Sequence, residues 1–583
     1  MPRARLGLLL VVLSACGHSA GAPPALLLLT LDTTNREALG CYGGPHGLTP
    51  NLDRLAREGV LFEDARAVAP LTLPAHASLL TGLYPVRHTL RRNGETRLAA
   101  EAHTLAELAR EHGHASAAFV AAVVLAPEFG LDQGFAHYDA PPTPENVEEH
   151  LIASRGADEI VARALAWLDQ HEPTQPFFLW LHFYDPHFPH DPAPEYLERA
   201  HGDPYMGEVA AMDAAIGTLL ARLERDGLLA NTLIVAAADH GESRGRHGEE
   251  THGAFVFDST LRIPLLARLP GAARAGERVR APVSQVDVVP LVARVLGWEL
   301  PRESANDLDG NDLDGRDPLA AQGAGVYFES YFGTKSFGWS PLAGWTDGRA
   351  KYVHSSAPEF FDLSADPGET HNVLGLRADE AARLRAHIAA LLLLPRLART
   401  PLDPGQESLQ REIERLGYAG ADAPPAEAEL EPLDAWRSPS PHRMSAAYAD
   451  YMAGRKLFEE KGSRESAIAL LERALSVNPE NHKAWFTLGL ARQDLGRFEA
   501  AADAFRKVLA LPGGERIAAQ LDLGVCLYNL GRPAEALREL ESALAETPGP
   551  PGALELLIRL LEEAGRGDDA VRARLRLTSH GQP

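Results

Sequence analysis

Residues 25–32 read ALLLLTLD, a run of apolar residues that ends in the carboxylate of Asp32. Because residues 26–31 offer apolar side chains to both faces, they are typical of a central strand that helices cover on each side. Similar runs alternate with helix-like segments further along the chain, with strands expected at 115–120, 177–181, 233–237 and 263–267 and helices at 104–111 and 158–168. This alternation predicts an α/β domain over residues 25–395.

Two stretches depart from this pattern. Residues 327–353 are strand-rich and are expected to form a small antiparallel sheet, which a helix at 377–394 follows. Residues 396–447 contain many proline and acidic residues, so we interpret them as a linker that a short helix at 407–416 interrupts.

The composition narrows the range of protein classes. The 583 residues are 45% hydrophobic and 23% charged, which is ordinary for soluble globular domains and excludes a multi-span membrane protein or a disordered chain. A net charge of −24 without a basic stripe repels polyphosphate backbones, so nucleic acid is not an expected partner. Three cysteines cannot build a disulfide framework.

The first residues resemble an export signal. Arg3 and Arg5 precede an apolar run at 6–13 that is too short to span a bilayer, and Leu13-Ser14-Ala15-Cys16 follows it. This tetrapeptide resembles a bacterial lipobox, which implies a signal peptide at 1–15 and lipidation of Cys16. The protein is therefore expected to be exported to the bacterial cell envelope and bound to the membrane by a lipid anchor. A soluble secreted protein that is cut nearby is the alternative.

The last part of the chain contains an internal repeat. Small and apolar residues recur at intervals of 34 and 35 residues, namely Ala467, Leu471 and Ala474, then Ala501, Phe505 and Val508, then Ala536, Leu540 and Ala543. The pattern resembles tetratricopeptide repeats and predicts an all-α solenoid of units at 448–481, 482–515, 517–550 and 551–583, the last one truncated. Such arrays bind protein partners, here of unknown identity; an unrelated helical bundle is the alternative.

Polar residues follow two of the expected strands. Asp32 ends the first one, and the strand at 233–237 runs into Asp239 and His240. Thr72 precedes a helix-like start at Pro74, where the positive end of a helix favours an alkoxide or a bound oxyanion. Since open α/β sheets place ligands at the carboxyl ends of their strands, these four side chains predict a cation site. For Thr72 alone, the alternative is an ordinary helix N-cap.

Several motifs together carry a family resemblance. They are LGCYG at 39–43, TPNLDRLA at 49–56, LLTGLYP at 79–85, DPH at 185–187, DHGE at 239–242 and FDLSADP at 361–367. In this order they resemble the sulfatase branch of the alkaline phosphatase superfamily. The resemblance implies a sandwich around a central, mostly parallel sheet, and a metal-assisted hydrolase whose nucleophile at position 72 attacks sulfur or phosphorus.

The sequence departs from typical sulfatases at the nucleophile and at the metal ligands. Sulfatases have Cys or Ser in Cys-x-Pro-x-Arg, which is oxidised to formylglycine, whereas this chain has Thr72 and ends the segment with His76. Threonine cannot give that aldehyde. A second aspartate is also missing after Asp32, and His240 supplies an imidazole, so the resemblance favours Zn²⁺ or Mn²⁺ over Ca²⁺.

At these positions the chain instead resembles the phosphorus-processing members of the superfamily. These are the nucleotide pyrophosphatases and the phosphoethanolamine transferases, which use a metal-bound threonine. By that analogy Asp32, Thr72, Asp239 and His240 bind one metal, and Thr72 forms a covalent phosphothreonine. A phosphate ester or diester of a small molecule, glycan or lipid is therefore the favoured substrate, ahead of a sulfate ester.

Other polar residues join the list of candidate catalytic residues. His252 is assigned to substrate oxygens or a second metal, and His187 to substrate contact and the leaving group. His247 is a weaker candidate. His76 either replaces the arginine of the motif or caps the helix, and Asn93 either donates to an oxyanion or forms an Asn-Gly turn.

Two rival functions remain open at this point. One is a transferase that moves a phosphorylated head group to an envelope glycan or lipid, and the other is a catalytically inactive scaffold. If the protein is a hydrolase or a transferase, removal of residues 448–583 is expected to leave the turnover of small substrates intact.

Overall fold

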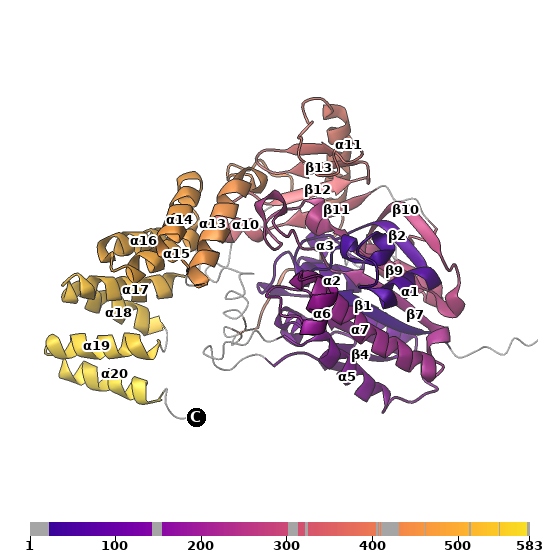
Figure 1. The fold of residues 1–583 in the computed structure, drawn as a ribbon, viewed down its shortest axis with the longest axis horizontal. Helices are drawn as coiled ribbons and strands as arrows, with labels where there is room; N and C mark the ends of the chain where they lie inside the picture. Colours follow the sequence, from indigo (N-terminus) through magenta and orange to yellow (C-terminus); the bar gives the residue numbers. More distant parts are fainter. Residues whose placement is uncertain are drawn as a thin grey trace, which may run out of the picture.

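The structure is a computed structural model that describes residues 23–142, 154–300, 313–320, 325–403, 406, 409, 431–460, 462–511, 515–546 and 549–579. The expected signal peptide, Cys16 and nearly all of the expected helix at 407–416 lie outside these residues. The chain forms a domain built around a sheet, here called the sheet domain, and a run of paired helices, here called the repeat array (Figure 1). Within the described ranges, no helix is both long enough and apolar enough to cross a bilayer.

The core of the sheet domain is a mostly parallel sheet, as expected. Its strand order is β10-β2-β9-β7-β1-β6-β4-β5, and β8 pairs with β2. The strands are β1 (Ala25–Leu31), β2 (Val60–Arg66), β4 (Ala115–Phe119), β5 (His137–Asp139), β6 (Phe177–Phe183), β7 (Thr232–Ala238), β8 (Arg262–Ile263), β9 (Leu265–Arg268) and β10 (Glu277–Ser284). The strand expected at 263–267 is instead two short antiparallel strands, β8 and β9, because Pro264 between them has no N–H for a ladder.

Helices cover the sheet in two groups. One group consists of α1 (Pro50–Glu58), α5 (Ala157–Leu168), α6 (Pro194–Arg199) and α7 (Pro204–Arg225), which contact one another. The other consists of α2 (Thr72–Thr81), α4 (Leu105–Glu111) and α9 (Val288–Leu296). All seven residues of β1 are buried, which agrees with the prediction that this strand is covered on both faces.

A second, antiparallel sheet follows, as the strand-rich sequence predicts. It joins β11 (Val326–Ser330), β12 (Leu342–Thr346), β13 (Ala350–His354) and β14 (Glu359–Asp362), the last of which lies beyond the expected range. The helix α11 (Ala378–Leu391) packs on β12 and β13. A short helix, α10 (Phe332–Phe337), lies between β11 and β12 in the chain.

The stretch expected to be a linker is packed where it is described. The backbone N–H of Leu397 donates to Arg87, and β15 (Thr400–Pro401) pairs with β3 (Thr96–Arg97). Further on, the His442 ring stacks on Phe257 with the ring centroids 4.0 Å apart. These parts of 396–447 thus belong to the sheet domain, because a few apolar and aromatic side chains among the prolines are buried against it.

In its described residues the repeat array has four helix pairs that match the expected units, with α13 beginning at Ser445 and α17 at Arg516, slightly before the expected starts. They are α13 (Ser445–Glu459) and α14 (Arg464–Val477), α15 (His482–Asp494) and α16 (Phe498–Ala510), α17 (Arg516–Asn529) and α18 (Pro533–Glu546), and α19 (Pro551–Glu563) and α20 (Gly567–Ser579). The last unit has both helices and is not truncated. A glycine allows close packing within a pair, since a Cβ on Gly489 would lie 2.6 Å from the Phe505 ring.

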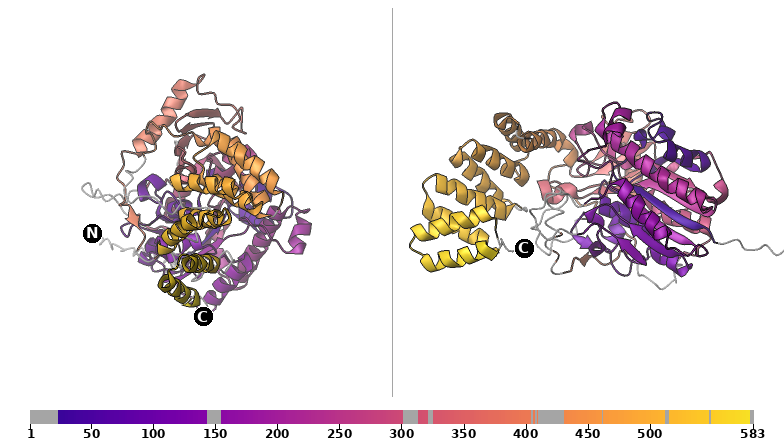
Figure 2. Two further views of the ribbon diagram at one scale, coloured as in Figure 1. Left: turned by 90° about the vertical axis from the view of Figure 1, so that its left-hand side faces the viewer. Right: turned by 60° about the horizontal axis from the view of Figure 1, so that its bottom comes forward.

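The array projects from the sheet domain, and in the part of the chain that the structure describes its main contacts with that domain come from its first helices, α13 and α15 (Figures 1 and 2). The contact is built from aromatic rings, here called the interdomain aromatic cluster: Phe255, Phe337, Trp339, His442, Tyr448 and Tyr451. Tyr448 of α13 lies 5.6 Å from Phe255 and 5.4 Å from Phe337, measured between ring centroids. A continuous hydrophobic core therefore runs from the sheet into α15, and a second cluster is centred on α16 and the later helices, with Trp485 of α15 packed against both.

Candidate active site

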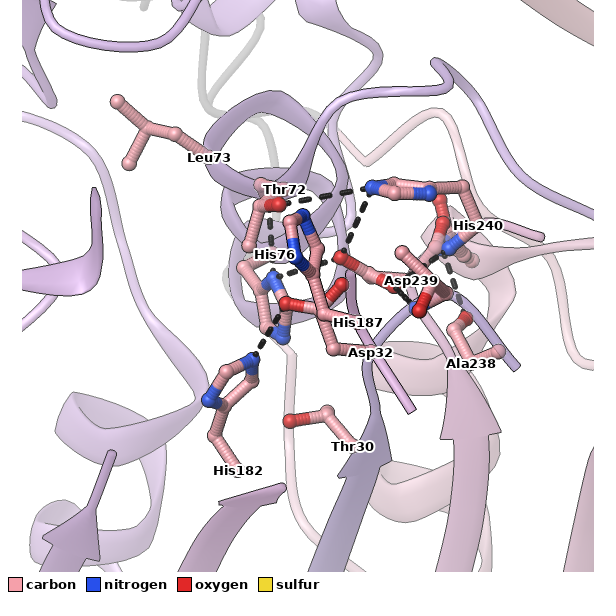
Figure 3. Close-up of polar contacts among 12 residues, drawn as sticks. Thr30, Asp32, Thr72, Leu73, His76, His182, His187, Ala238, Asp239 and His240 are labelled. Carbon is pink, nitrogen blue, oxygen red and sulfur yellow. Dashed lines mark hydrogen bonds and ion pairs between the residues drawn. The ribbon is translucent and has the colours of Figure 1, made fainter. Parts of the chain in front are cut away.

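The predicted site residues meet at one edge of the central sheet (Figure 3). Asp32 follows β1, and Asp239 follows the last residue of β7. The two strands are parallel neighbours whose last residues, Leu31 and Ala238, are paired. Two side chains that are 207 positions apart in the sequence thus become adjacent, because parallel strands end at the same edge.

All four expected metal ligands lie together. Asp32, Asp239 and His240 each offer one ligand atom within 4.8 Å of the others. The hydroxyl oxygen of Thr72 lies 3.5 Å from Nε2 of His240. All four side chains are buried.

Thr72 is not a helix N-cap. The helix α2 begins at Thr72, two residues before the expected start at Pro74, and its N-cap residue is Leu71, whose side chain makes no capping bond. The Thr72 hydroxyl is therefore left to face His240 at the positive end of the helix.

In each of the two aspartates, one carboxylate oxygen has hydrogen-bond partners and the other has none among the described residues. Oδ1 of Asp239 accepts from the backbone N–H of Thr33 and of His240 at 3.1 and 2.7 Å, while its Oδ2 has no hydrogen-bond partner in the described chain. For Asp32 the unpartnered atom is Oδ1. Burial raises the pKa of both aspartates, and the charge of Asp32 raises that of Asp239 further.

This arrangement fits a divalent cation. Two adjacent buried carboxylates without a counter-charge are costly, and a cation beside their unpartnered oxygens removes that cost. The donor set consists of two carboxylates, an imidazole and a hydroxyl, which are ordinary ligands for such an ion. Burial lowers the pKa of His240 to about 3, so its ring is neutral and able to act as a ligand.

The candidates His187 and His252 lie on one side of this group. The His252 ring is 4.2 Å from the His240 ring, and Nε2 of His252 is 3.2 Å from Nε2 of His187. Nδ1 of His252 lies 3.1 Å from the carbonyl oxygen of Pro70, which directs the ring. The weaker candidate His247 lies elsewhere, stacked on Phe257 at 3.7 Å.

His76 does not cap the helix but lies inside it. Its Nδ1 is 2.8 Å from the carbonyl oxygen of Thr72 and 3.8 Å from Oδ2 of Asp239. Burial, together with His182, lowers the pKa of His76. The imidazole thus lies beside Asp239, one of the expected metal ligands, at the position that the resemblance equates with the arginine of the sulfatase motif.

The expected Asn-Gly turn is present at Asn93, and its role as a donor to an oxyanion stays a prediction. Gly94 has a φ of +78°, which is a turn conformation, and Oδ1 of Asn93 accepts from the backbone N–H of Leu73 at 3.0 Å. The amide nitrogen of Asn93 is buried and has no hydrogen-bond partner among the described residues. It is therefore available as a donor near the start of α2.

Two residues near the site were missed by the sequence analysis. Nε2 of His182, on β6, lies 3.2 Å from Oδ2 of Asp32. The side-chain amide of Asn35 donates to the carbonyl oxygen of Glu242 at 2.8 Å and accepts from the backbone N–H of Glu242 at 2.9 Å. These two bonds connect the loop after β1 to the loop after β7. A signal for His182 existed, because it is a lone polar ring in the apolar strand FFLWLHF.

Family profiles agree with this architecture. The sulfatase profile matches residues 24–298, and tetratricopeptide repeat profiles match residues 456–516, 493–549 and 527–580. The chain carries a sulfatase domain of the alkaline phosphatase superfamily, followed by tetratricopeptide repeats. The sulfatase domain makes the protein an ester hydrolase by family.

Curated relatives and solved structures resemble this sulfatase domain. The ulvan-active sulfatase of Formosa agariphila is 28% identical over 410 residues, which cover 60% of this chain and 77% of that protein. Human arylsulfatase A is 28% identical over 448 residues, which cover 63% and 86%. The crystal structure of the phosphonate monoester hydrolase of Agrobacterium radiobacter has the same fold, with a TM-score of 0.51, 24% identity and coverage of 64% and 95%. The names of the two curated relatives refer to sulfatases, so they do not support a preference for phosphate esters.

Proposed function

We propose that the sulfatase domain is a divalent-metal-dependent hydrolase that cleaves a phosphate ester or diester with Thr72 as its nucleophile. The observation that carries the proposal is the placement of the Thr72 hydroxyl, 3.5 Å from Nε2 of His240 and at the positive end of α2. That oxygen is buried beside two carboxylates and is not used for capping.

The chemistry of threonine favours phosphorus over sulfur. Oxidation of its secondary alcohol gives a ketone, so Thr72 cannot form the aldehyde hydrate through which sulfatases expel sulfate. A threonine oxygen can instead displace the leaving group from phosphorus and form a phosphoester. Water then attacks that phosphorus and releases Thr72 with phosphate or a phosphate monoester.

Asp32, Asp239, His240 and Thr72 are the residues that would hold the cation. A bound divalent cation lowers the pKa of a coordinated hydroxyl and neutralises negative charge on substrate oxygens. Because the donor set includes an imidazole and only two carboxylates, we propose Zn²⁺ or Mn²⁺ in preference to Ca²⁺.

The remaining residues would manage protons and charge. His187 and His252, with their Nε2 atoms 3.2 Å apart, can pass a proton to the leaving group and take one from the attacking water. The unpartnered amide of Asn93 can donate to the oxygen on which charge develops. His76 lies 3.8 Å from Asp239 and supports the carboxylate from within α2.

We also propose that the protein acts at the bacterial cell envelope on an ester of a small molecule, glycan or lipid. The basis is the lipobox-like Leu13-Ser14-Ala15-Cys16 at the start of the chain. Cell fractionation of the wild type and of Cys16→Ser tests it, since the variant should leave the membrane fraction. The repeat array is proposed to recruit a protein partner there.

The activity test compares aryl phosphate, bis-aryl phosphate and aryl sulfate as substrates for the wild type, Thr72→Ala and Thr72→Ser. Without its nucleophile, Thr72→Ala should lose at least about 10³-fold in kcat/KM on the phosphorus substrates. Thr72→Ser keeps a hydroxyl and should retain measurable turnover together with a covalent phosphoenzyme. Aryl sulfate turnover that exceeds phosphate turnover and persists in Thr72→Ala would show that Thr72 is not the nucleophile.

A further inference from the structure

We infer that His182 is a positioning residue that fixes the carboxylate of Asp32 in the orientation needed to bind the cation. Nε2 of His182 lies 3.2 Å from Oδ2 of Asp32, and both side chains are fully buried. The inference rests on the metal centre proposed above.

The hydrogen-bond network assigns the proton of the His182 ring. The backbone N–H of Ala121 lies 3.2 Å from Nδ1 of His182, and a backbone N–H can only donate. Nδ1 is therefore the acceptor nitrogen of a neutral ring, and Nε2 carries the hydrogen. His182 is thus a donor to Oδ2 of Asp32, and the backbone of Ala121 prevents the opposite tautomer.

The register between β1 and β6 explains how this contact arises. Thr30 is paired with His182, so the ring reaches diagonally forward to Asp32, which lies two residues after Thr30 and directly follows β1. One step earlier, Trp180 is paired with Leu28 and donates diagonally to the hydroxyl of Thr30 at 2.9 Å. The same diagonal geometry thus occurs twice, but only the contact from His182 reaches a proposed metal ligand.

The two carboxylate oxygens of Asp32 therefore have different roles, one for the hydrogen bond and one for the cation. His182 occupies Oδ2, while Oδ1 is buried without a hydrogen-bond partner in the described chain. In Figure 3 His182 lies on the far side of the Asp32 carboxylate from His240. Asp239 is held in the same way, by backbone N–H groups on one oxygen only. Hydrogen-bonded partners of this kind hold ligating carboxylates and tune their affinity.

The test measures metal affinity rather than turnover. Metal-free protein is titrated with Zn²⁺ and with Mn²⁺ against a chromophoric chelator, for the wild type, His182→Ala, His182→Gln and Trp180→Phe. His182→Ala should bind the metal about 10–100-fold more weakly, which is the usual effect of losing such a partner. His182→Gln retains an N–H donor near the Nε2 position and should recover most of the affinity. Trp180→Phe is the matched control, since it removes the neighbouring diagonal bond, and its affinity should equal that of the wild type.

The possible outcomes separate this inference from the proposed centre. If the wild type binds neither metal, the centre itself is wrong. If the wild type binds but His182→Ala binds equally well, or if Trp180→Phe is weakened as much, only the role of His182 is overturned. Nitrogen NMR of the wild-type imidazoles decides independently of any variant that fails to fold. The proton on Nε2 of His182 supports the inference, and a proton on Nδ1 overturns it.

Discussion

The sheet domain and the repeat array are held together in opposite ways. In the sheet domain, the contact between the Thr33 backbone and Asp239 joins residues 206 positions apart. In the array, each helix packs mainly on its neighbours in the chain, as Gly489 does on Phe505. The chemistry therefore depends on the topology of the whole sheet, whereas the array depends on a local rule that is repeated four times.

The boundary between these two kinds of structure does not coincide with the start of the repeat pattern. The core of the sheet domain continues through the interdomain aromatic cluster into α13, α14 and α15, and the second cluster is centred on α16 and the later helices. By its packing, the beginning of the array belongs to the sulfatase domain. The shared core leads us to predict that residues 448–583 cannot be removed without affecting the hydrolase.

The largest expected effect comes from removing the whole array at the start of α13. Deletion of 445–583 exposes the aromatic rings that α13 covers, so we expect aggregation or a large loss of soluble, active protein. Deletion of 549–583 removes only the last helix pair and should leave hydrolase activity at the level of the full chain. Soluble yield, thermal unfolding and turnover of an aryl ester measure both.

A point substitution sharpens the same test. Tyr448→Ala removes one ring of the cluster and should cost about 3–5 kcal/mol of the stability of the sulfatase domain. Tyr528→Ala, in α17, is the matched control and should leave hydrolysis unchanged. A soluble and fully active 445–583 deletion would contradict the shared core.

The next effect compares a buried ion-pair cluster of the sheet domain with an exposed ion pair of the array. Oδ1 of Asp258 lies 2.5 Å from Arg66 and 3.1 Å from Lys351. Burial alone would raise the pKa of Asp258, but the two cations outweigh it and hold the pKa well below its usual value. Its contribution to stability is therefore present above about pH 4 and is lost as the pH falls below that value.

Asp258→Asn is expected to cost at most about 3–5 kcal/mol near pH 7, because it removes the carboxylate that Arg66 and Lys351 share and leaves them only Asp64 and Glu369. The difference from the wild type should shrink as the pH approaches 2. Glu465→Gln, which removes the exposed pair with Arg497, should leave the free energy of unfolding nearly unchanged. Denaturant unfolding across the pH range measures both. A constant difference between the wild type and Asp258→Asn at all pH values would contradict the assignment.

The smallest effect is expected inside the array. Gly489→Ala places a methyl group 2.6 Å from the Phe505 ring and should cost about 1–3 kcal/mol of array stability without changing hydrolysis. Gly552→Ala is the matched control, since a Cβ there meets nothing within 4 Å and alanine is the better helix former. Circular dichroism during thermal unfolding, with turnover measured in parallel, distinguishes the two. Gly489→Ala protein as stable as the wild type would show that this close approach is unimportant.

The sequence predicted the parts of the site that stand at recognisable positions. Asp32, Asp239 and His240 each follow an apolar strand, and Thr72 lies in a family motif, so their meeting could be anticipated. His182 could not be assigned in this way, because its partner depends on the register between β1 and β6 and on the tautomer that Ala121 imposes. Neither the register nor the tautomer can be predicted from the local sequence of the strand.

The same reasoning explains which parts of the fold were missed. The four repeat units follow from their spacing, including the last one, whose second helix the sequence analysis undervalued. The packed residues of 396–447 were misread because proline and acidic residues dominate the composition, while single side chains such as Leu397 and His442 decide whether a segment docks. Docking of this kind depends on a surface elsewhere in the chain.

The loop after β7 links the two regions of the molecule. It carries His240 and His252 at the site and, three residues after His252, it contributes Phe255 to the rings that meet Tyr448 of the array. The position of this loop therefore depends on the packing of the first repeat as well as on the sheet domain. Exchange of arrays between relatives, in evolution or in the laboratory, should succeed at junctions beyond α15 and fail at the junction before α13.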